Sequence, residues 1–438
     1  MTVRRALVAI VLPAALLAAA VIATAAGAGT TAKVGSGTAS ATKSVCGLGT
    51  GKKATGTPIK IGAIATKQAG TDFTDIPNMA QAYFNCVNDN GGIYGHPIKY
   101  YIETEQTNPA QIAGLAKKLV SSDHVVAVVG NTSLIECTVD HKYWEQQGFF
   151  VIDSGIAPEC YSTSHSAAVN MGPRYSSDGA AQYVLSQHVS KLVFDQSNVP
   201  GLGYNSGGVE LIAKAAGVPE QSLADDVPIQ DANSVALKLV QAAGSSGGIV
   251  LNFTPDQAAL ILQAAQKQGL EDSVKAWACS TPCNSDFLAQ SLGSAWDNKL
   301  FVNAELNLTG APGPDAALYN AIITKYKPTL AFGVASFSQM GFVEGRVAVA
   351  ALLSMGKGAS YTVKSVNQAI ENVKNFKTDI LCKPWYYGNA PLHIPNNTDR
   401  TVTPSNGKMV LKQGCSPISA VDPAIAKVRA IEKKQGIK

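Results

Sequence analysis

Apolar strand-like segments alternate with amphipathic helical segments over residues 58–155, and this alternation constrains the fold more than any other feature of the sequence. The strand PIKIGAI precedes a helical segment that places these apolar residues on one face: Phe73, Ile76, Ala80, Tyr83, Phe84 and Val87. The turn Asn90-Gly91-Gly92 leads to the next strand, and HVVAVVG and GFFVIDSG follow as further strands. Repeated strand–helix units of this kind form a parallel sheet covered by helices, and ligands bind at the carboxyl ends of its strands.

The same alternation begins again after Asp178. KLVFDQ, GGIVLNF, VKAWAC and KLFVNAEL are predicted strands, and helical segments separate them. A chain of 438 residues is too long for a single hydrophobic core, so two domains are expected. We therefore predict an α/β protein with two Rossmann-like lobes, each a parallel sheet flanked by helices, and a cleft between the lobes.

The amino terminus predicts export. Arg4 and Arg5 precede an almost uncharged run over residues 6–26, which contains a small-residue A-T-A site at 23–25. A basic start, an apolar middle and such a site are typical of a secretory signal peptide, so we expect residues 1–28 to be cleaved. The run is also about long enough for a membrane helix, which needs roughly 20 residues, and retention as an anchor is therefore the alternative.

The segment that follows the predicted signal peptide, residues 29–57, is rich in Gly, Ser, Thr, Ala and Lys, a composition that predicts a flexible leader. A lipid-modified cysteine would have to follow the apolar run directly, and Cys46 comes about twenty residues too late. We expect an exported protein without a lipobox, on the extracellular or cell-envelope side of the cytoplasmic membrane.

Eight cysteines in an exported chain predict disulfides, although eight cysteines allow 105 pairings. Proximity in the inferred fold favours four pairs: Cys46 with Cys86, Cys137 with Cys160, Cys279 with Cys283, and Cys382 with Cys415. The short loop that the third pair closes lacks a second cysteine pair and a nearby histidine, so we interpret it as a local staple and expect no metal.

The formal net charge of +4 arises partly from the carboxyl-terminal residues 423–438, in which lysines alternate with Ala, Val and Ile. No aromatic residues interleave with these lysines. We interpret this basic tail as a solvated helix, and we expect no binding of nucleic acid.

Enzymatic motifs are missing from the sequence. The segment 201–207 is glycine-rich, but its third glycine is one residue too far for a dinucleotide fingerprint. We find no P-loop, no G-x-S-x-G elbow, no H-E-x-x-H and no ligand-like histidine pair. We therefore expect no cofactor and no catalysis.

The order of these segments, together with the phrase N..GGI.G.PI at Asn88–Ile98, resembles the type I periplasmic substrate-binding proteins of the branched-chain amino acid (Leu/Ile/Val-binding) ABC transporter family. The resemblance covers Pro58 to about Cys415. It implies a three-crossing hinge between the lobes and a Venus-flytrap closure. The resemblance assigns 58–178 plus 309–377 to the amino-terminal lobe and 179–308 plus 378–422 to the carboxyl-terminal lobe.

The family's ligand contacts come from loops that follow strands. Carried over residue by residue, with the charge at Glu305 as a further candidate for the cleft, they predict these ligand-binding positions: Gln68, Phe73, Thr132, Ser133, Leu134, Ser154, Gly155, Ala157, Tyr175, Tyr204, Thr254, Thr281 and Glu305. Three positions depart from the pattern: Leu134 replaces a hydroxyl, Ala157 a threonine and Thr281 an acidic residue. Burying a zwitterion without such anchors costs several kcal/mol per unpaired group, which argues against a free L-amino acid.

The resemblance implies a monomeric, non-enzymatic solute-binding protein of an ABC transporter. It would bind a small polar or amphipathic ligand, an amino acid or related compound, in the interlobe cleft and deliver it to a membrane permease. An extracellular ligand sensor is the alternative, followed by a secreted α/β hydrolase.

Overall fold

We describe the fold from a computed structural model of the chain, in which residues 44–388 and 390–437 are described. The predicted signal peptide and the first part of the predicted leader lie outside these residues. The described residues belong to one compact unit. Within them, no helix is both long and apolar enough to cross a membrane.

The first sheet is built from the amino-terminal part of the chain. Its strands run in the order β2-β1-β4-β5-β6. Strand β3 also pairs with β1, along Ile59–Thr66, whereas β2 pairs with the end of β1 at Lys67 and Gln68, and all pairs except β1 with β2 are parallel. The strands are β1 (Ile59–Gln68), β2 (Thr71–Asp72), β3 (Ile98–Glu105), β4 (Ala127–Asn131), β5 (Val151–Asp153) and β6 (Ser166–Ala168).

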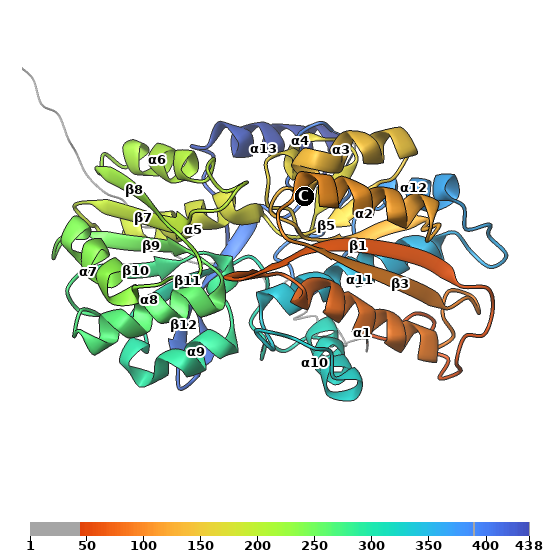
Figure 1. Ribbon diagram of the computed structural model, residues 1–438, viewed down its shortest axis with the longest axis horizontal. Coiled ribbons are helices and arrows are strands. Elements are labelled where there is room, and N and C mark those ends of the chain that lie inside the picture. The colour runs from red at the N-terminus through yellow and green to blue at the C-terminus, as the bar shows by residue number, and fades with distance from the viewer. Residues whose placement is uncertain (1–43, 389, 438) are drawn as a thin grey trace, which may run out of the picture. The chain divides into compact units, whose positions relative to one another are not determined.

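Helices from two distant parts of the sequence cover this sheet (Figure 1). Helices α1 (Asp75–Asp89), α2 (Pro109–Ser121), α3 (Glu136–Gln147) and α4 (Glu159–Ser162) lie between the strands in sequence, and α10 (Pro314–Tyr326), α11 (Ser336–Ser354) and α12 (Val363–Glu371) join them from later in the chain. Helix α1 buries the apolar face that the sequence predicts. It packs closely on α11 because Gly341 has no side chain, and a Cβ there would overlap the carbonyl oxygen of Ile76.

The second sheet contains the remaining strands in the order β13-β12-β11-β10-β9-β7-β8. Its central strands are parallel, whereas β12 and β13 are antiparallel to their neighbours. The strands are β7 (Leu192–Ser197), β8 (Glu220–Asp225), β9 (Gly248–Asn252), β10 (Ala276–Cys279), β11 (Leu300–Ala304), β12 (Thr398–Ser405) and β13 (Lys408–Pro417). Its helices are α5 (Gly172–Ser186), α6 (Ser206–Ala215), α7 (Ala232–Ala243), α8 (Pro255–Lys267) and α9 (Asp286–Leu292), with 3-10 turns at Thr281–Cys283 and Gly293–Trp296.

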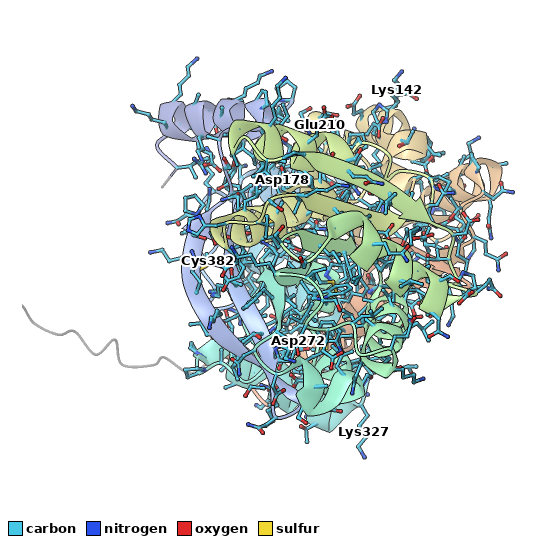
Figure 2. The ribbon with its side chains drawn as sticks, turned by 90° about the vertical axis from the view of Figure 1, so that its left-hand side faces the viewer. Lys142, Asp178, Glu210, Asp272, Lys327 and Cys382 are labelled. Carbon is cyan, nitrogen blue, oxygen red and sulfur yellow. A yellow bond between two sulfur atoms is a disulfide. The ribbon has the colours of Figure 1, made fainter. Side chains whose placement is uncertain are left out.

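The chain passes between the two sheets three times: from β6 through α5 to β7, from β11 to α10, and from α12 to β12. This arrangement confirms the predicted fold class, two α/β lobes, each with a mostly parallel sheet, joined by three crossings of the chain. The lobe boundaries themselves stay a prediction. Asp178, where we expect the first lobe to end, is fully buried on α5 (Figure 2). Its carboxyl group occupies the space that a side chain at Gly208 would need, which holds α5 close to α6.

Four disulfides connect the eight cysteines, and they are the pairs that proximity favours: Cys46–Cys86, Cys137–Cys160, Cys279–Cys283 and Cys382–Cys415. The first ties the described part of the predicted leader to α1. Backbone hydrogen bonds from Thr50 to Asn90 and from Ala54 to Asn88 fasten the same segment, at 3.2 and 2.8 Å.

The basic tail forms helix α13 (Pro423–Gln435), which begins at Asp422, whose side chain accepts a hydrogen bond from the N–H of Ala424. The helix is solvated on one face only, because Ile425 and Val428 on the other face are buried in a cluster that includes residues of α4 and α5. Two ion pairs, Arg174–Asp422 at 2.8 Å and Lys383–Glu432 at 2.6 Å, add polar contacts at its two ends. The lysines of the helix itself face solvent.

Candidate ligand-binding pocket

A pocket lies where the carboxyl ends of strands from both sheets meet. Residues that follow β1, β4, β5 and β6 line it from the first sheet, and residues that follow β7, β9, β10 and β11 line it from the second. The pocket offers about 70 Å³ to the centres of water molecules, which is room for about five of them. In open α/β sheets this edge is where ligands bind.

Hydrogen bonds and backbone pairing between the two sheets' loops surround the pocket. The hydroxyl of Tyr204 donates to the carbonyl of Ile156 at 2.8 Å, and that of Ser336 donates to the carbonyl of Thr281 at 3.0 Å. A short antiparallel bridge joins Ser285 to Ala335. The two lobes therefore contact each other around the pocket.

Apolar side chains make up much of the lining. Phe73 and Phe337 meet edge to face with ring centroids 5.5 Å apart, and the other apolar lining residues are Ile76, Leu134, Ile156, Val199, Leu202, Phe253 and Met340. Such an enclosure favours a ligand with an apolar body, since burial of apolar surface contributes roughly 25 cal/mol per Å².

Glu305 directly follows β11 and is the one ionisable residue among those of the described chain that line the pocket. It is 1% exposed, and the backbone N–H of Met171 donates to its Oε2. Burial raises the pKa of Glu305 to about 8, although the Met171 N–H and the nearby Thr281 hydroxyl oppose the increase and Asp399 adds to it. No ion pair within the described residues involves Glu305.

Buried carboxyl groups of the first lobe accept hydrogen bonds from the hydroxyls near β1, β4 and β5. Ser154 donates to Oε1 of Glu344 at 2.6 Å, and Glu344 itself is completely buried on α11. Burial raises the pKa of Glu344 well above its ordinary value. Thr66 and Ser133 both donate to Oε1 of Glu105. These contacts fix the loops that follow β1, β4 and β5.

Two threonine hydroxyls of the second lobe also have protein acceptors. Thr281 donates to Oδ1 of Asn303 at 2.8 Å, and Thr254 makes a long contact of 3.4 Å with the carbonyl of Gly70. Asn252 differs, because its Oδ1 accepts from Ser280 while its buried Nδ2 has no partner among the described residues. The pocket therefore contains an unused amide donor at the end of β9.

About half of the predicted ligand-binding positions line this pocket: Phe73, Thr132, Leu134, Ser154, Thr254, Thr281 and Glu305. The others lie outside its lining. Gln68 accepts a hydrogen bond from Thr107, and Ser133 caps α3 by accepting from the N–H of Glu136. Tyr204 contacts the backbone at Ile156, as described above.

Three more predicted positions are buried behind the pocket rather than in it. Gly155 packs against Cys160 and Tyr161, and Ala157 and Tyr175 belong to the apolar cluster beneath α13. Ile156, between Gly155 and Ala157, is the residue of that turn which lines the pocket. Whether any of the predicted positions contacts a ligand stays a prediction.

Reasoning from sequence did not select several lining residues. Asn170 lies between β6 and α5, Gly172 and Pro173 begin α5, and Ser197 and Asn252 end β7 and β9. The position of Ser197 and Asn252 at strand ends was a usable signal. Phe337 and Met340 carried no such signal, because they reach the pocket from the first turns of α11.

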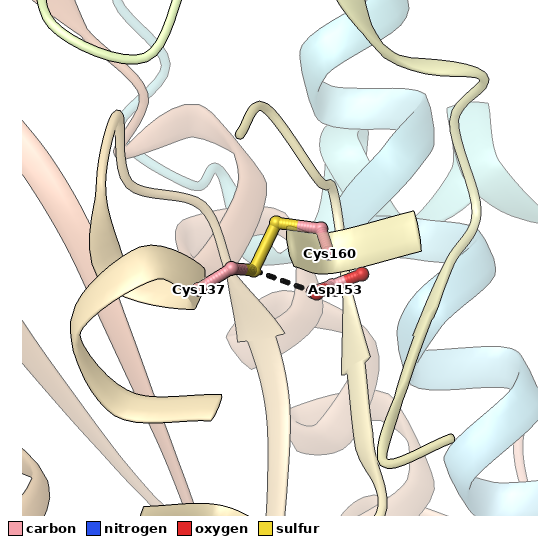
Figure 3. Close-up of side chains that lie close together, drawn as sticks. All are labelled: Cys137, Asp153 and Cys160. Atoms are coloured by element: carbon pink, nitrogen blue, oxygen red, sulfur yellow. Dashed lines mark hydrogen bonds between the residues drawn. A yellow bond between two sulfur atoms is a disulfide. The ribbon is translucent and has the colours of Figure 1, made fainter. Parts of the chain in front are cut away.

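Cys137, Asp153 and Cys160 form the one cluster in the described chain whose ligand-type atoms lie close enough together to hold a metal ion (Figure 3). The two sulfurs are bonded to each other, so neither is the thiolate that a metal requires. Sγ of Cys137 lies 3.5 Å from Oδ2 of Asp153. A disulfide sulfur carries no proton, so we interpret this as a packing contact.

The family model for periplasmic binding proteins matches residues 58–402. The chain belongs to the periplasmic binding protein family. The predicted resemblance is thereby confirmed, and the match covers both sheets except the last residues of β12 and all of β13. Comparison of this periplasmic binding protein with curated proteins found no match.

Solved structures share the fold at low sequence identity. A branched-chain amino acid ABC transporter protein from Thermus thermophilus with bound valine is 14% identical, with a TM-score of 0.74, over 85% of this chain and 100% of the other. A fatty acid ABC transporter substrate-binding protein from Thermomonospora curvata is 18% identical, with a TM-score of 0.70, over 85% of this chain and 96% of the other. The substrate-binding protein LivJ from Streptococcus pneumoniae, in complex with isoleucine, is 16% identical, with a TM-score of 0.66, over 82% and 100%. At these identities the likeness establishes the type I fold of this periplasmic binding protein.

Proposed function

We propose that this protein is the extracytoplasmic solute-binding component of an ABC transporter, which encloses a small amphipathic molecule between its lobes and delivers it to a membrane permease. The observation that carries the proposal is the pocket itself, which lies at the carboxyl ends of strands of both sheets and combines an apolar lining with a few buried polar groups. The family and the titles of the similar structures support the transporter assignment.

Lobe closure supplies the mechanism. A ligand that touches Thr132 and Ser154 on one side and Thr254 and Glu305 on the other makes all its contacts only when the lobes are together. Its binding free energy therefore favours the closed form by the difference in affinity between the two forms. A permease that recognises the closed arrangement would then receive loaded protein in preference to empty protein.

Binding without catalysis fits the lining better than hydrolysis. No His, Cys or Lys is among the described residues that line the pocket. The hydroxyl of Thr281 donates to Asn303, whose amide is not a base. The hydroxyl of Ser154 donates to Glu344, whose pKa is raised well above its ordinary value by burial, so that this carboxyl group is protonated and is a poor base for a nucleophile. We therefore propose that the protein is not an enzyme, acts as a monomer and needs no cofactor.

The proposal extends to export through the predicted signal peptide, 1–28. An oxidising compartment is consistent with four disulfides that leave no free thiol among the eight cysteines. Intact-mass measurement of protein from its native secretion route tests this part. A mass that includes residues 1–28, or a lipid on Cys46, would contradict it.

A thermal-shift screen of ligand-free protein against amino acids, amides, amines, aromatic acids and sugars tests the function. A ligand at one hundred times its Kd should stabilise the folded state by about 2.7 kcal/mol, and small-angle scattering should then record a smaller radius of gyration. Leucine, isoleucine and valine should bind weakly or not at all, because Leu134, Ala157 and Thr281 replace the family's anchors. If no compound both stabilises the protein and closes it, or if a bound compound is turned over, the proposed function is wrong.

A further inference from the structure

The direction of the hydrogen bonds around the pocket limits which hydrogen-bonding groups of a ligand the protein can bind. A hydroxyl has one proton to donate and two lone pairs that accept. Ser154 and Thr281 each give that proton to a protein acceptor, at 2.6 and 2.8 Å. Their remaining capacity toward the pocket is to accept hydrogen bonds. A ligand carboxylate, which only accepts, therefore finds no donor in these two hydroxyls.

Glu305 adds a negative charge, or a group able to carry one, to the same lining. It is buried without a counter-charge among the described residues. The titratable groups that face it are Asp399 of β12 and Tyr161 of α4, and neither is cationic. A buried carboxylate needs a charged or hydrogen-bonding partner. The N–H of Met171 and the nearby hydroxyl of Thr281, whose single proton Asn303 also accepts, supply only part of that need.

Aromatic rings complete an environment suited to a cation. Phe73, Phe253 and Phe337 line the pocket that contains Glu305, and the faces of aromatic rings attract ammonium groups. No Lys, Arg or His of the described chain is among the lining residues, so a ligand carboxylate would meet no positive side chain.

From these observations we infer that the ligand is an amphipathic amine: a protonated amino group that pairs with Glu305, attached to an apolar body, and no carboxylate. The inference rests on the proposed solute-binding function and names the class of solute.

The unpaired Nδ2 of Asn252 can donate a hydrogen bond to one neutral acceptor elsewhere on the ligand. Asn252 ends β9 and Glu305 follows β11; one strand separates β9 from β11, and Glu305 lies two residues beyond the position level with Asn252, so their backbones lie about 12 Å apart. An acceptor at Asn252 would therefore be separated from the amine by several bonds, unlike the carboxylate of an α-amino acid.

Two matched sets of compounds test this inference on the ligand-free protein by calorimetry. The first set is leucine, 3-methylbutylamine and 4-methylpentanoate, and the second is phenylalanine, 2-phenylethylamine and 3-phenylpropionate. Within each set the apolar body is kept while the amine or the carboxylate is removed. We expect the amine to bind at least ten-fold more tightly than the other two. Tighter binding of the acid or of the amino acid would overturn the inference and leave the solute-binding function standing.

Variants separate the role of Glu305 from a general effect on folding. Glu305→Gln should weaken amine binding at least thirty-fold, as truncation of one partner of a buried charge pair does, and Glu305→Asp should retain part of the preference for amines. Glu210→Gln, at an exposed position of α6, is the matched control and should bind like the parent. An unchanged affinity in a folded Glu305→Gln variant would contradict the pairing.

The pH dependence gives an independent readout. A cation binds the ionised carboxylate, so a carboxyl group with a pKa of about 8 must first lose its proton. The affinity for the amine should therefore rise roughly fifty-fold from pH 6 to pH 8, and Glu305→Gln should remove that rise. If the broader screen finds ligands but no amine among them, the inference is wrong. If no class of compound binds, the solute-binding function fails and the inference with it.

Discussion

Replacing Glu305 by Gln is expected to make the stability of the ligand-free protein less dependent on pH. The carboxyl group is 1% exposed, and its pKa is raised from 4.5 to about 8, mainly by burial. Because the folded state holds the proton more tightly than the unfolded state does, the group's contribution is fully present below about pH 4.5. It is lost as the pH rises through 8. Glutamine is neutral throughout this range and lacks the effect.

The size of this change in unfolding free energy follows from the interval between the pKa of Glu305 in the unfolded state, 4.5, and in the folded state, about 8. Between pH 6 and pH 9 the unfolded state has its glutamate ionised throughout, whereas the folded state loses its proton near pH 8. Two pH units of differential protonation correspond to about 3 kcal/mol, at 1.36 kcal/mol per unit. Relative to the variant, the parent protein should therefore lose on the order of 3 kcal/mol of unfolding free energy over this interval.

Urea unfolding of both proteins, with disulfides intact, at a series of pH values from 5 to 9 measures this difference. The informative quantity is the change with pH of the difference between the two unfolding free energies, so an overall offset caused by the substitution cancels. Glu210→Gln at the surface controls for the removal of any one carboxylate (Figure 2). Parallel profiles for the parent and Glu305→Gln would refute the assignment of Glu305 as a buried, protonated acid.

Two further predictions concern the frame around the pocket. Gly341→Ala should destabilise the protein by at least 1 kcal/mol in urea unfolding, because the added methyl would overlap the carbonyl of Ile76. Gly114→Ala, in the open middle of α2, should instead stabilise it by about 1 kcal/mol, and equal effects of the two alanines would contradict the packing argument. Replacing both Cys46 and Cys86 by Ala should lower the unfolding free energy by about 4 kcal/mol, the loop-closure value for a separation of 40 residues. A loss below 1 kcal/mol in urea unfolding would show that hydrogen bonds, not the disulfide, hold the segment before β1.

The fold could be predicted because its pattern is local. Central strands of the sheets such as β4 and β9 are short, fully buried runs, and intervening helices such as α1 carry an apolar face. The tail was harder to interpret. Ile425 and Val428 look like isolated apolar residues among lysines, and only the folded chain brings the surfaces of α4 and α5 against them. The local sequence of α13 contains no information about that partner.

The pocket could be located only in part. Positions next to strand ends were within reach of the sequence. The family resemblance selected Thr132, Ser154 and Thr254, Glu305 was selected as a charge that could face the cleft, and all four line the pocket. Phe337 could not be found, because nothing in the composition of a long apolar helix such as α11 identifies which turn faces a pocket. Helices that arrive from distant parts of the chain contribute to the lining without a local signal.

The least predictable property of the pocket is the direction in which its hydroxyl groups form hydrogen bonds. Sequence reasoning treats a serine or threonine after a strand as a donor that awaits a ligand. In the folded protein the proton of Ser154 goes to Glu344, a residue 190 positions away on α11. The carboxyl of Glu344 is buried and apolar groups surround its helix, so the hydroxyl is the partner that makes its burial tolerable. The hydroxyls of Thr66 and Ser133 donate to the carboxyl group of Glu105 in the same way. Because Glu344 and Glu105 take the protons of Ser154, Thr66 and Ser133, these three hydroxyls are left as acceptors, and a serine after a strand can therefore offer a ligand an accepting group in place of a donating one.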